Sequence, residues 1–173
     1  IGSCFGSTGP ISDDYATQSS YRYKFPVITI KDMVKAQRIL LDSLGIYKLE
    51  AIIGGSMGGM QALQAAVDFP NLAKKVFALA TTHATRPWAI AFNKVEQESI
   101  LEDPSFKKGY YDPIDIVANG LVGLAVGRMA GHISFLSPDS MDKKFGRQYK
   151  RTDGLYELFG KFQVESYLEY NGY

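Results

Sequence analysis

The chain has 173 residues, 46 % of them hydrophobic, which is enough to bury one sizeable core and excludes a disordered protein. A formal net charge of +1, without a basic run interleaved with aromatic residues, argues against nucleic-acid binding. The single cysteine, Cys4, excludes an internal disulfide framework and fits a reducing compartment, so we expect a cytoplasmic protein. The longest apolar run, residues 116–127, contains Asn119 and is too short to span a bilayer, so we expect no membrane segment.

The first half of the chain predicts alternating helices and strands. Residues 2–23, rich in Gly, Ser, Thr and Tyr without periodicity, predict a long loop. An apolar stripe with helical spacing predicts a helix over 32–44, ending at Gly45. A buried strand over 49–53, a helix over 57–69 and a second buried strand over 75–80 follow. Such alternation favours an α/β fold with a parallel sheet, whose active site lies at the carboxyl ends of the strands.

A Gly-x-Ser-x-Gly motif stands at the junction of the first strand and the following helix. The motif, Gly54 to Gly58, resembles the nucleophile elbow of α/β-hydrolase-type enzymes, in which a tight turn lifts a serine clear of the sheet. Ser56 is the candidate nucleophile, and the amide of Met57 is the natural first donor to an oxyanion. We expect Gly54 and Gly58 to remove side chains that would collide, and Gly59 to add room for helix packing. The alternative interpretation is a plain glycine-rich turn between a strand and a helix.

Beyond Thr82 the sequence predicts only helices and loops. Helices are expected over 88–101 and over 112–135, and a final helical segment over 163–170. In the second of these, glycines recur at steps of three and four residues, which favours close helix packing; they are Gly120, Gly123, Gly127 and Gly131. Arg128 and His132 lie four residues apart and share one side of that helix.

Several stretches besides the elbow resemble the homoserine O-acetyltransferase family, which ordinary hydrolases with the same elbow do not match. The matching stretches are 2–10, 25–34, 54–64, 90–93, 123–133, 145–147 and 164–168. The resemblance implies part of an α/β-hydrolase fold, with core strands and the elbow in residues 1–84 and a mainly helical lid in 85–173.

The resemblance also implies a reaction and its site. The family transfers an acetyl group from acetyl-CoA to the hydroxyl of L-homoserine, in methionine biosynthesis, through a serine acyl-enzyme. By resemblance, Ser56 is the nucleophile, Met57 N–H supplies half of the oxyanion hole, and Arg128 binds the homoserine carboxylate. Phe135 stands where the family often has tyrosine. We expect no metal, no cofactor other than acetyl-CoA as the acyl-donor substrate, and a homodimer formed through the lid helices, with Gly120 to Gly131 as a candidate surface.

The base of a serine nucleophile is the part of the site that the sequence does not provide. Neither of the two histidines, His83 and His132, matches the family's catalytic histidine, and the partner acid is not matched either. We therefore expect the chain to be the middle portion of the enzyme, without its terminal core strands, marginally folded alone and with an exposed apolar sheet edge. The alternatives are a relative that uses succinyl-CoA or serine, an α/β-hydrolase esterase, and an inactive fragment.

Overall fold

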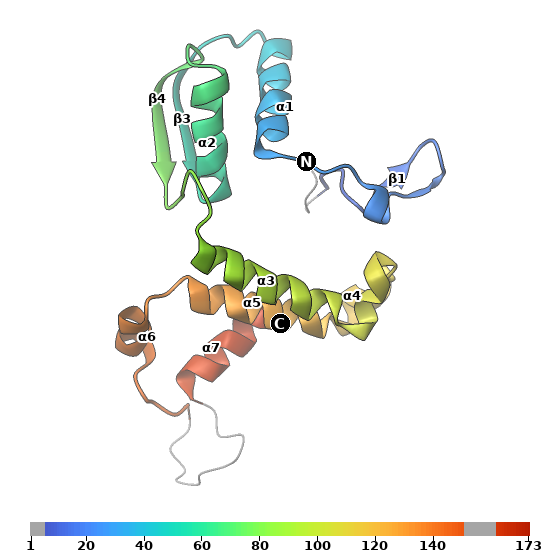
Figure 1. Ribbon diagram of the computed structural model, residues 1–173, viewed down its shortest axis with the longest axis vertical. Helices are drawn as coiled ribbons and strands as arrows, with labels where there is room; N and C mark the ends of the chain where they lie inside the picture. Colours follow the sequence, from blue (N-terminus) through green and yellow to red (C-terminus); the bar gives the residue numbers. More distant parts are fainter. Residues whose placement is uncertain (1–5, 151–161) are drawn as a thin grey trace. The chain divides into compact units, whose positions relative to one another are not determined.

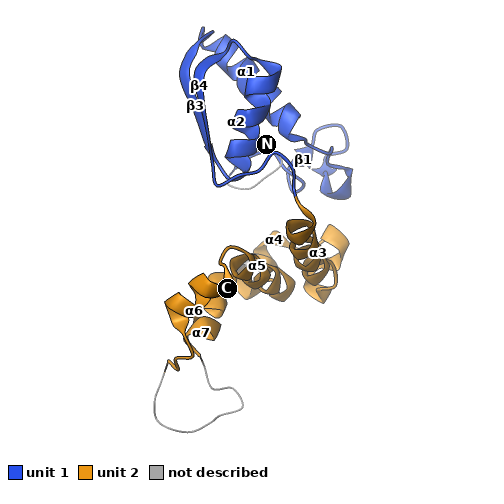
Figure 2. Cartoon of the chain, turned by 60° about the vertical axis from the view of Figure 1, so that its left-hand side comes forward, with its two compact units in different colours: residues 1–85 blue, residues 86–173 orange. Residues whose placement is uncertain are grey.

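A computed structural model describes residues 6–150 and 162–173 of the chain (Figure 1). The chain divides into two compact units, residues 1–85 and residues 86–173 (Figure 2). The elements of the first unit are β1 (Asp13–Asp14), β2 (Ser19–Ser20), the 3₁₀ turn η1 (Arg22–Lys24), α1 (Ile30–Ser43), β3 (Leu49–Gly55), α2 (Met57–Asp68) and β4 (Ala73–Leu79). Cys4 lies outside the described residues.

The centre of the first unit is a β-α-β motif. Strands β3 and β4 pair in parallel with Ile53 opposite Phe77 and Gly55 opposite Leu79, and α2 connects them. Helices α1 and α2 lie together on one face of this sheet in both views (Figures 1 and 2). Because the two strands are parallel, their carboxyl ends meet at one edge, which is where the sequence placed the site.

The helices and strands of this unit confirm the predicted alternation. Helix α1 begins earlier than predicted because Thr29 forms a capping box, in which its hydroxyl accepts from the Asp32 amide while the Asp32 carboxylate accepts from the Thr29 amide. Two small buried core residues, Ala62 and Ala65, bring α2 close to the sheet. The predicted loop at the start of the chain is correct in its main character, although residues 13–14 and 19–20 form a short antiparallel pair.

The second unit is helical, as predicted. Its elements are α3 (Pro87–Leu101), the 3₁₀ segment η2 (Pro104–Gly109), α4 (Pro113–Asn119), α5 (Val122–Ser134), α6 (Pro138–Phe145) and α7 (Gln163–Gly172). The single helix expected over 112–135 is wrong, because Gly120 adopts φ 77° and ψ 175° and separates α4 from α5. Helix α6 was not predicted; Ser137 caps its N-terminus by accepting from the Ser140 amide, and Pro138 occupies its first turn.

The glycines of α5 serve packing inside the chain. A Cβ added to Gly123 would lie 2.0 Å from the Ser99 carbonyl oxygen, and a Cβ added to Gly127 would lie 3.1 Å from the Ser99 hydroxyl oxygen. Both glycines are buried against α3, which confirms the packing interpretation. The same contacts leave Gly123 and Gly127 unavailable to a partner chain, whereas a Cβ on Gly120 would meet no other part of the described chain within 4 Å; the homodimer itself stays a prediction. Within the described residues, no helix combines the length and apolar character needed to cross a membrane.

Candidate active site

Ser56 lies at the tip of a strained turn between β3 and α2. Its backbone has φ 53° and ψ −121°, a conformation that L-residues rarely adopt and that costs roughly 1–3 kcal/mol. The residue is exposed, and its hydroxyl makes no capping bond to the helix that it precedes. A strained, exposed serine whose hydroxyl is not used by the fold is the geometry of a nucleophile elbow.

The two motif glycines have different surroundings. A Cβ on Gly54 would lie 2.0 Å from the carbonyl oxygen of Gly58 and 2.7 Å from the amide nitrogen of Gly59, so the turn requires glycine at residue 54. Apart from its chain neighbours and the backbone of its own helix, a Cβ on Gly58 would meet no heavy atom within 4 Å in the described part of the chain. The expectation that Gly54 avoids a collision is therefore confirmed. For Gly58 the described residues show no atom with which a side chain would collide.

The first turn of α2 presents donors beside Ser56. Within the described residues, the amides of Met57 and Gly58 have no acceptor, whereas the Gly59 amide donates to the Ser56 carbonyl oxygen at 3.0 Å. Free amides at a helix N-terminus, together with the positive end of the helix dipole, suit a developing oxyanion. The Met57 amide is thus available for the role that the sequence predicts.

The carboxyl end of β4 holds the elbow from the other side. The Ser56 amide donates to the Leu79 carbonyl oxygen at 3.0 Å, and the Thr81 hydroxyl donates to the Ser56 carbonyl oxygen at 2.6 Å. A Cβ on Gly59 would lie 2.6 Å from Thr81 Cβ, so Thr81 packs directly on the Gly59 backbone. Sequence reasoning missed Thr81, because only the parallel pairing of β3 with β4 brings it to the elbow.

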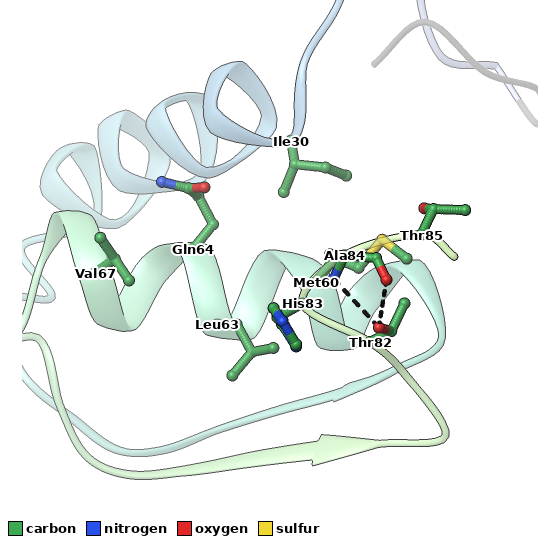
Figure 3. A pocket seen from close by; sticks show the side chains of 9 residues that line it. All are labelled: Ile30, Met60, Leu63, Gln64, Val67, Thr82, His83, Ala84 and Thr85. Carbon is green, nitrogen blue, oxygen red and sulfur yellow. Dashed lines mark hydrogen bonds between the residues drawn. The ribbon is translucent and has the colours of Figure 1, made fainter. Parts of the chain in front are cut away.

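Neither histidine forms a pair with the nucleophile, since Ser56 Oγ makes no hydrogen bond within the described part of the chain. His83 is exposed beside a hollow of about 260 Å³ that also contacts Leu63 and Thr82, and Ser56 does not line this hollow (Figure 3). His132 lies in the second unit, where its Nδ1 is 3.2 Å from the Tyr167 hydroxyl and its ring packs edge-on against Tyr167. His132 therefore joins α5 to α7.

Arg128 is exposed on α5, and its Nε donates to the carbonyl oxygen of Asn171 at the end of α7, at 2.8 Å. Within the described residues its two Nη groups make no hydrogen bond, so they remain available as donors. The same residues contain no group of three or more His, Cys, Asp or Glu side chains that could hold a metal ion.

Among the described residues, two carboxyl groups have a shifted pKa, and both take part in capping a helix N-terminus. Hydrogen bonds from the Thr29 hydroxyl and amide lower the pKa of Asp32. The amides of Gly123 and Ser105 lower the pKa of Asp103. Both shifts therefore belong to the fold and not to the chemistry at Ser56.

The sequence profile described as the alpha/beta hydrolase fold matches residues 3–167. The chain belongs to this family. Its curated relatives sharpen the assignment, since the chain is 74 % identical, over 173 residues, to the homoserine O-acetyltransferase of Sulfurimonas autotrophica, covering 100 % of this chain and 47 % of that protein. The resemblance inferred from the sequence is thereby confirmed. The chain spans about half the length of the curated relatives it matches.

Solved structures with the same fold include both transferases and hydrolases. The chain superposes on homoserine O-acetyltransferase from Bacillus anthracis with a TM-score of 0.78 and 25 % identity, covering 96 % of this chain and 44 % of that one. An acetylester hydrolase from Corynebacterium glutamicum gives a TM-score of 0.71 and 25 % identity, covering 95 % and 44 %. Proteins that share this fold therefore include an O-acetyltransferase and an ester hydrolase.

Proposed function

We propose that the protein is an acyltransferase that moves an acetyl group from acetyl-CoA to the hydroxyl of L-homoserine, a step of methionine biosynthesis in the cytoplasm. The observation that carries the proposal is the strained elbow that exposes Ser56 beside the free Met57 amide, in a chain 74 % identical to a homoserine O-acetyltransferase. Acetyl-CoA enters as a substrate, and no resident cofactor or metal is needed for this chemistry.

The reaction has two steps. Ser56 Oγ attacks the thioester carbonyl carbon while a base takes its proton; the tetrahedral oxyanion collapses, the C–S bond breaks and CoA leaves with a proton as the thiol. The homoserine hydroxyl then attacks the carbonyl carbon of the acetyl-Ser56 ester and gives its proton to the base. The C–O bond to Ser56 breaks, the base returns a proton to Ser56 Oγ, and O-acetylhomoserine leaves. The Met57 amide donates to the oxyanion in both steps.

Arg128 is proposed to bind the carboxylate of homoserine. Its support is the chemistry of the guanidinium fork, which pairs with carboxylates through two parallel hydrogen bonds, and the free Nη groups described above. The bond from Nε to the Asn171 carbonyl oxygen would then fix the direction of the fork. We further propose that the protein acts as a homodimer, built from surfaces of the lid helices other than the α3-covered glycines.

The test uses the protein at the length its cells produce. It is mixed with acetyl-CoA, and acetylation of Ser56 is followed by peptide mass spectrometry, with Ser56→Ala as the control. Homoserine, serine, aminopropanol and water then compete for the acyl group. We expect O-acetylhomoserine as the main product, and a weaker reaction with aminopropanol because it lacks the carboxylate that Arg128 would bind.

The competing candidate is an esterase, favoured by the likeness to the acetylester hydrolase. Release of acetate in preference to O-acetylhomoserine would contradict the transferase proposal and support this candidate. Faster acylation by succinyl-CoA, or preferential acylation of serine, would reassign the donor or the acceptor. A protein that is never acylated at Ser56 would be the inactive form.

A further inference from the structure

One peptide unit of the elbow carries both the proposed oxyanion donor and a hydrogen bond from the loop that follows β4. The carbonyl of Ser56 and the amide of Met57 belong to the same planar group, so the direction of one fixes the direction of the other. The Thr81 hydroxyl donates to that carbonyl oxygen at 2.6 Å, a short distance for a bond between oxygen atoms. The Thr81 bond therefore helps to fix the orientation of this peptide plane, and with it the direction of the Met57 N–H.

The approach of Thr81 to the elbow depends on a second strained residue. Ala80, directly after β4, has φ 46°, which is unusual for a residue with a side chain. The absence of a side chain at Gly59 makes room for Thr81, since a Cβ on residue 59 would lie 2.6 Å from Thr81 Cβ and Cγ2. The strained turn at Ala80 and the missing side chain at Gly59 thus serve the same contact.

We propose that Thr81 is a positioning residue for acyl transfer, whose hydroxyl orients and polarises the Met57 amide toward the oxyanion. A hydrogen bond accepted by an amide oxygen strengthens the N–H of the same amide as a donor, because bonds in a chain polarise one another. The inference rests on the proposed function only in requiring that Ser56 be acylated. It applies equally when homoserine or water is the acceptor.

The test measures Ser56 acylation by p-nitrophenyl acetate in the natural-length protein, because this reporter does not depend on the acceptor. Thr81→Val keeps the shape of the side chain and removes the hydroxyl. We expect kcat to fall roughly 10-fold with little change in KM, less than the roughly 100- to 1000-fold caused by losing an oxyanion donor outright. Thr81→Ser, which keeps the hydroxyl, should remain within about threefold of the wild type.

Thr82→Val is the matched control, because the Thr82 hydroxyl bonds to the following loop at the Ala84 carbonyl oxygen, 2.8 Å away. It should leave kcat and KM unchanged. Thermal unfolding of each variant shows whether it is folded. If Thr81→Val does not fold, Thr81→Ser is compared with Thr81→Cys, whose thiol is a weak donor, and the serine variant should be faster.

Three results would overturn the proposal. They are a folded Thr81→Val with wild-type kcat, equal losses in Thr81→Val and Thr81→Ser, and equal rates for the serine and cysteine variants. A wild-type protein that is acylated by p-nitrophenyl acetate but cannot use homoserine would contradict the transferase function. The Thr81 variants would still test the positioning role in that case, because it requires only that Ser56 be acylated. A wild-type protein that is never acylated at Ser56 would contradict both.

Discussion

Gly54 and Gly58 occupy equivalent places in the sequence motif but not in the structure. At residue 54 an added methyl group would overlap the backbone of Gly58, at 2.0 Å from its oxygen, and backbone atoms cannot move aside without opening the turn. We expect Gly54→Ala to reduce Ser56 acylation by at least about 100-fold, since misplacement of a reacting group by about 1 Å has that effect. The rate of acylation by p-nitrophenyl acetate measures this loss.

Gly58→Ala is the matched control for this substitution. Its new methyl group meets nothing within 4 Å in the described residues, and alanine in place of glycine stabilises a helix by about 1 kcal/mol. We expect a variant that is acylated at close to the wild-type rate. Equal damage from the two substitutions would mean that another part of the protein occupies the space beside Gly58.

Three glycines of α5 face α3, and the space for an added Cβ increases from Gly123 through Gly127 to Gly131. An added Cβ would meet the Ser99 carbonyl oxygen at 2.0 Å from Gly123, but only the flexible Glu96 carboxylate oxygen at 3.2 Å from Gly131. Overpacking costs about 1–3 kcal/mol, whereas the gain in helix propensity is about 1 kcal/mol. We therefore expect denaturant unfolding to show that Gly123→Ala destabilises the protein and that Gly131→Ala is neutral or stabilising. A destabilised Gly131→Ala together with an unaffected Gly123→Ala would contradict this account of α3–α5 packing.

Asp103 connects two helical elements through its carboxylate, which accepts from the Gly123 amide at 2.5 Å and from the Ser105 amide at 2.7 Å. These bonds lower its pKa from the ordinary value of 3.8. A carboxyl whose pKa is lower in the folded state stabilises the fold above the unfolded pKa, and this contribution is lost as the pH falls through the folded pKa.

We expect Asp103→Asn to lower the thermal midpoint at pH 7, and the difference from the wild type to shrink as the pH falls below about 4. The measurement is thermal unfolding over that pH range. Asp112→Asn is a suitable control because, among the described residues, the Asp112 carboxylate accepts from a single amide, that of Ile114. A difference for Asp103→Asn that stays constant down to the lowest pH would contradict a role for its ionised form.

Local sequence signals predicted most of these elements, and tertiary contacts explain the errors. The capping residue Thr29 and the apolar runs of β3 and β4 act over a few residues, so their elements could be recognised. The break at Gly120 depends on a positive φ that helical spacing does not reveal, and Ser137-Pro138 was an overlooked N-terminal signal for α6. At the site, the motif identified Ser56 and Met57, whereas Thr81 required knowledge of strand pairing.

The described sheet has two strands, and apolar side chains of both are open to solvent. Ile53 is 67 % exposed, Phe77 46 % and Leu79 55 %, and because Ile53 pairs with Phe77 these side chains form an uncovered apolar face of the sheet. A two-stranded sheet is marginal by itself, and helices α1 and α2 cover only one of its faces while the apolar side chains of the other face stay open. The relatives that this chain matches are about twice as long, because the chain covers 47 % of the first of them.

We therefore expect residues 1–173 expressed alone to bind the dye ANS strongly and to unfold without a sharp cooperative transition. Phe77→Ser should lower dye binding by this chain, because it removes an aromatic ring from the open sheet. Ile39→Ser is the control: this isoleucine is 70 % exposed on α1, away from the sheet. A sharp unfolding transition at high temperature, with no dye binding, would mean that the chain covers these strands itself, and the exposed sheet would no longer be a reason to expect partner strands.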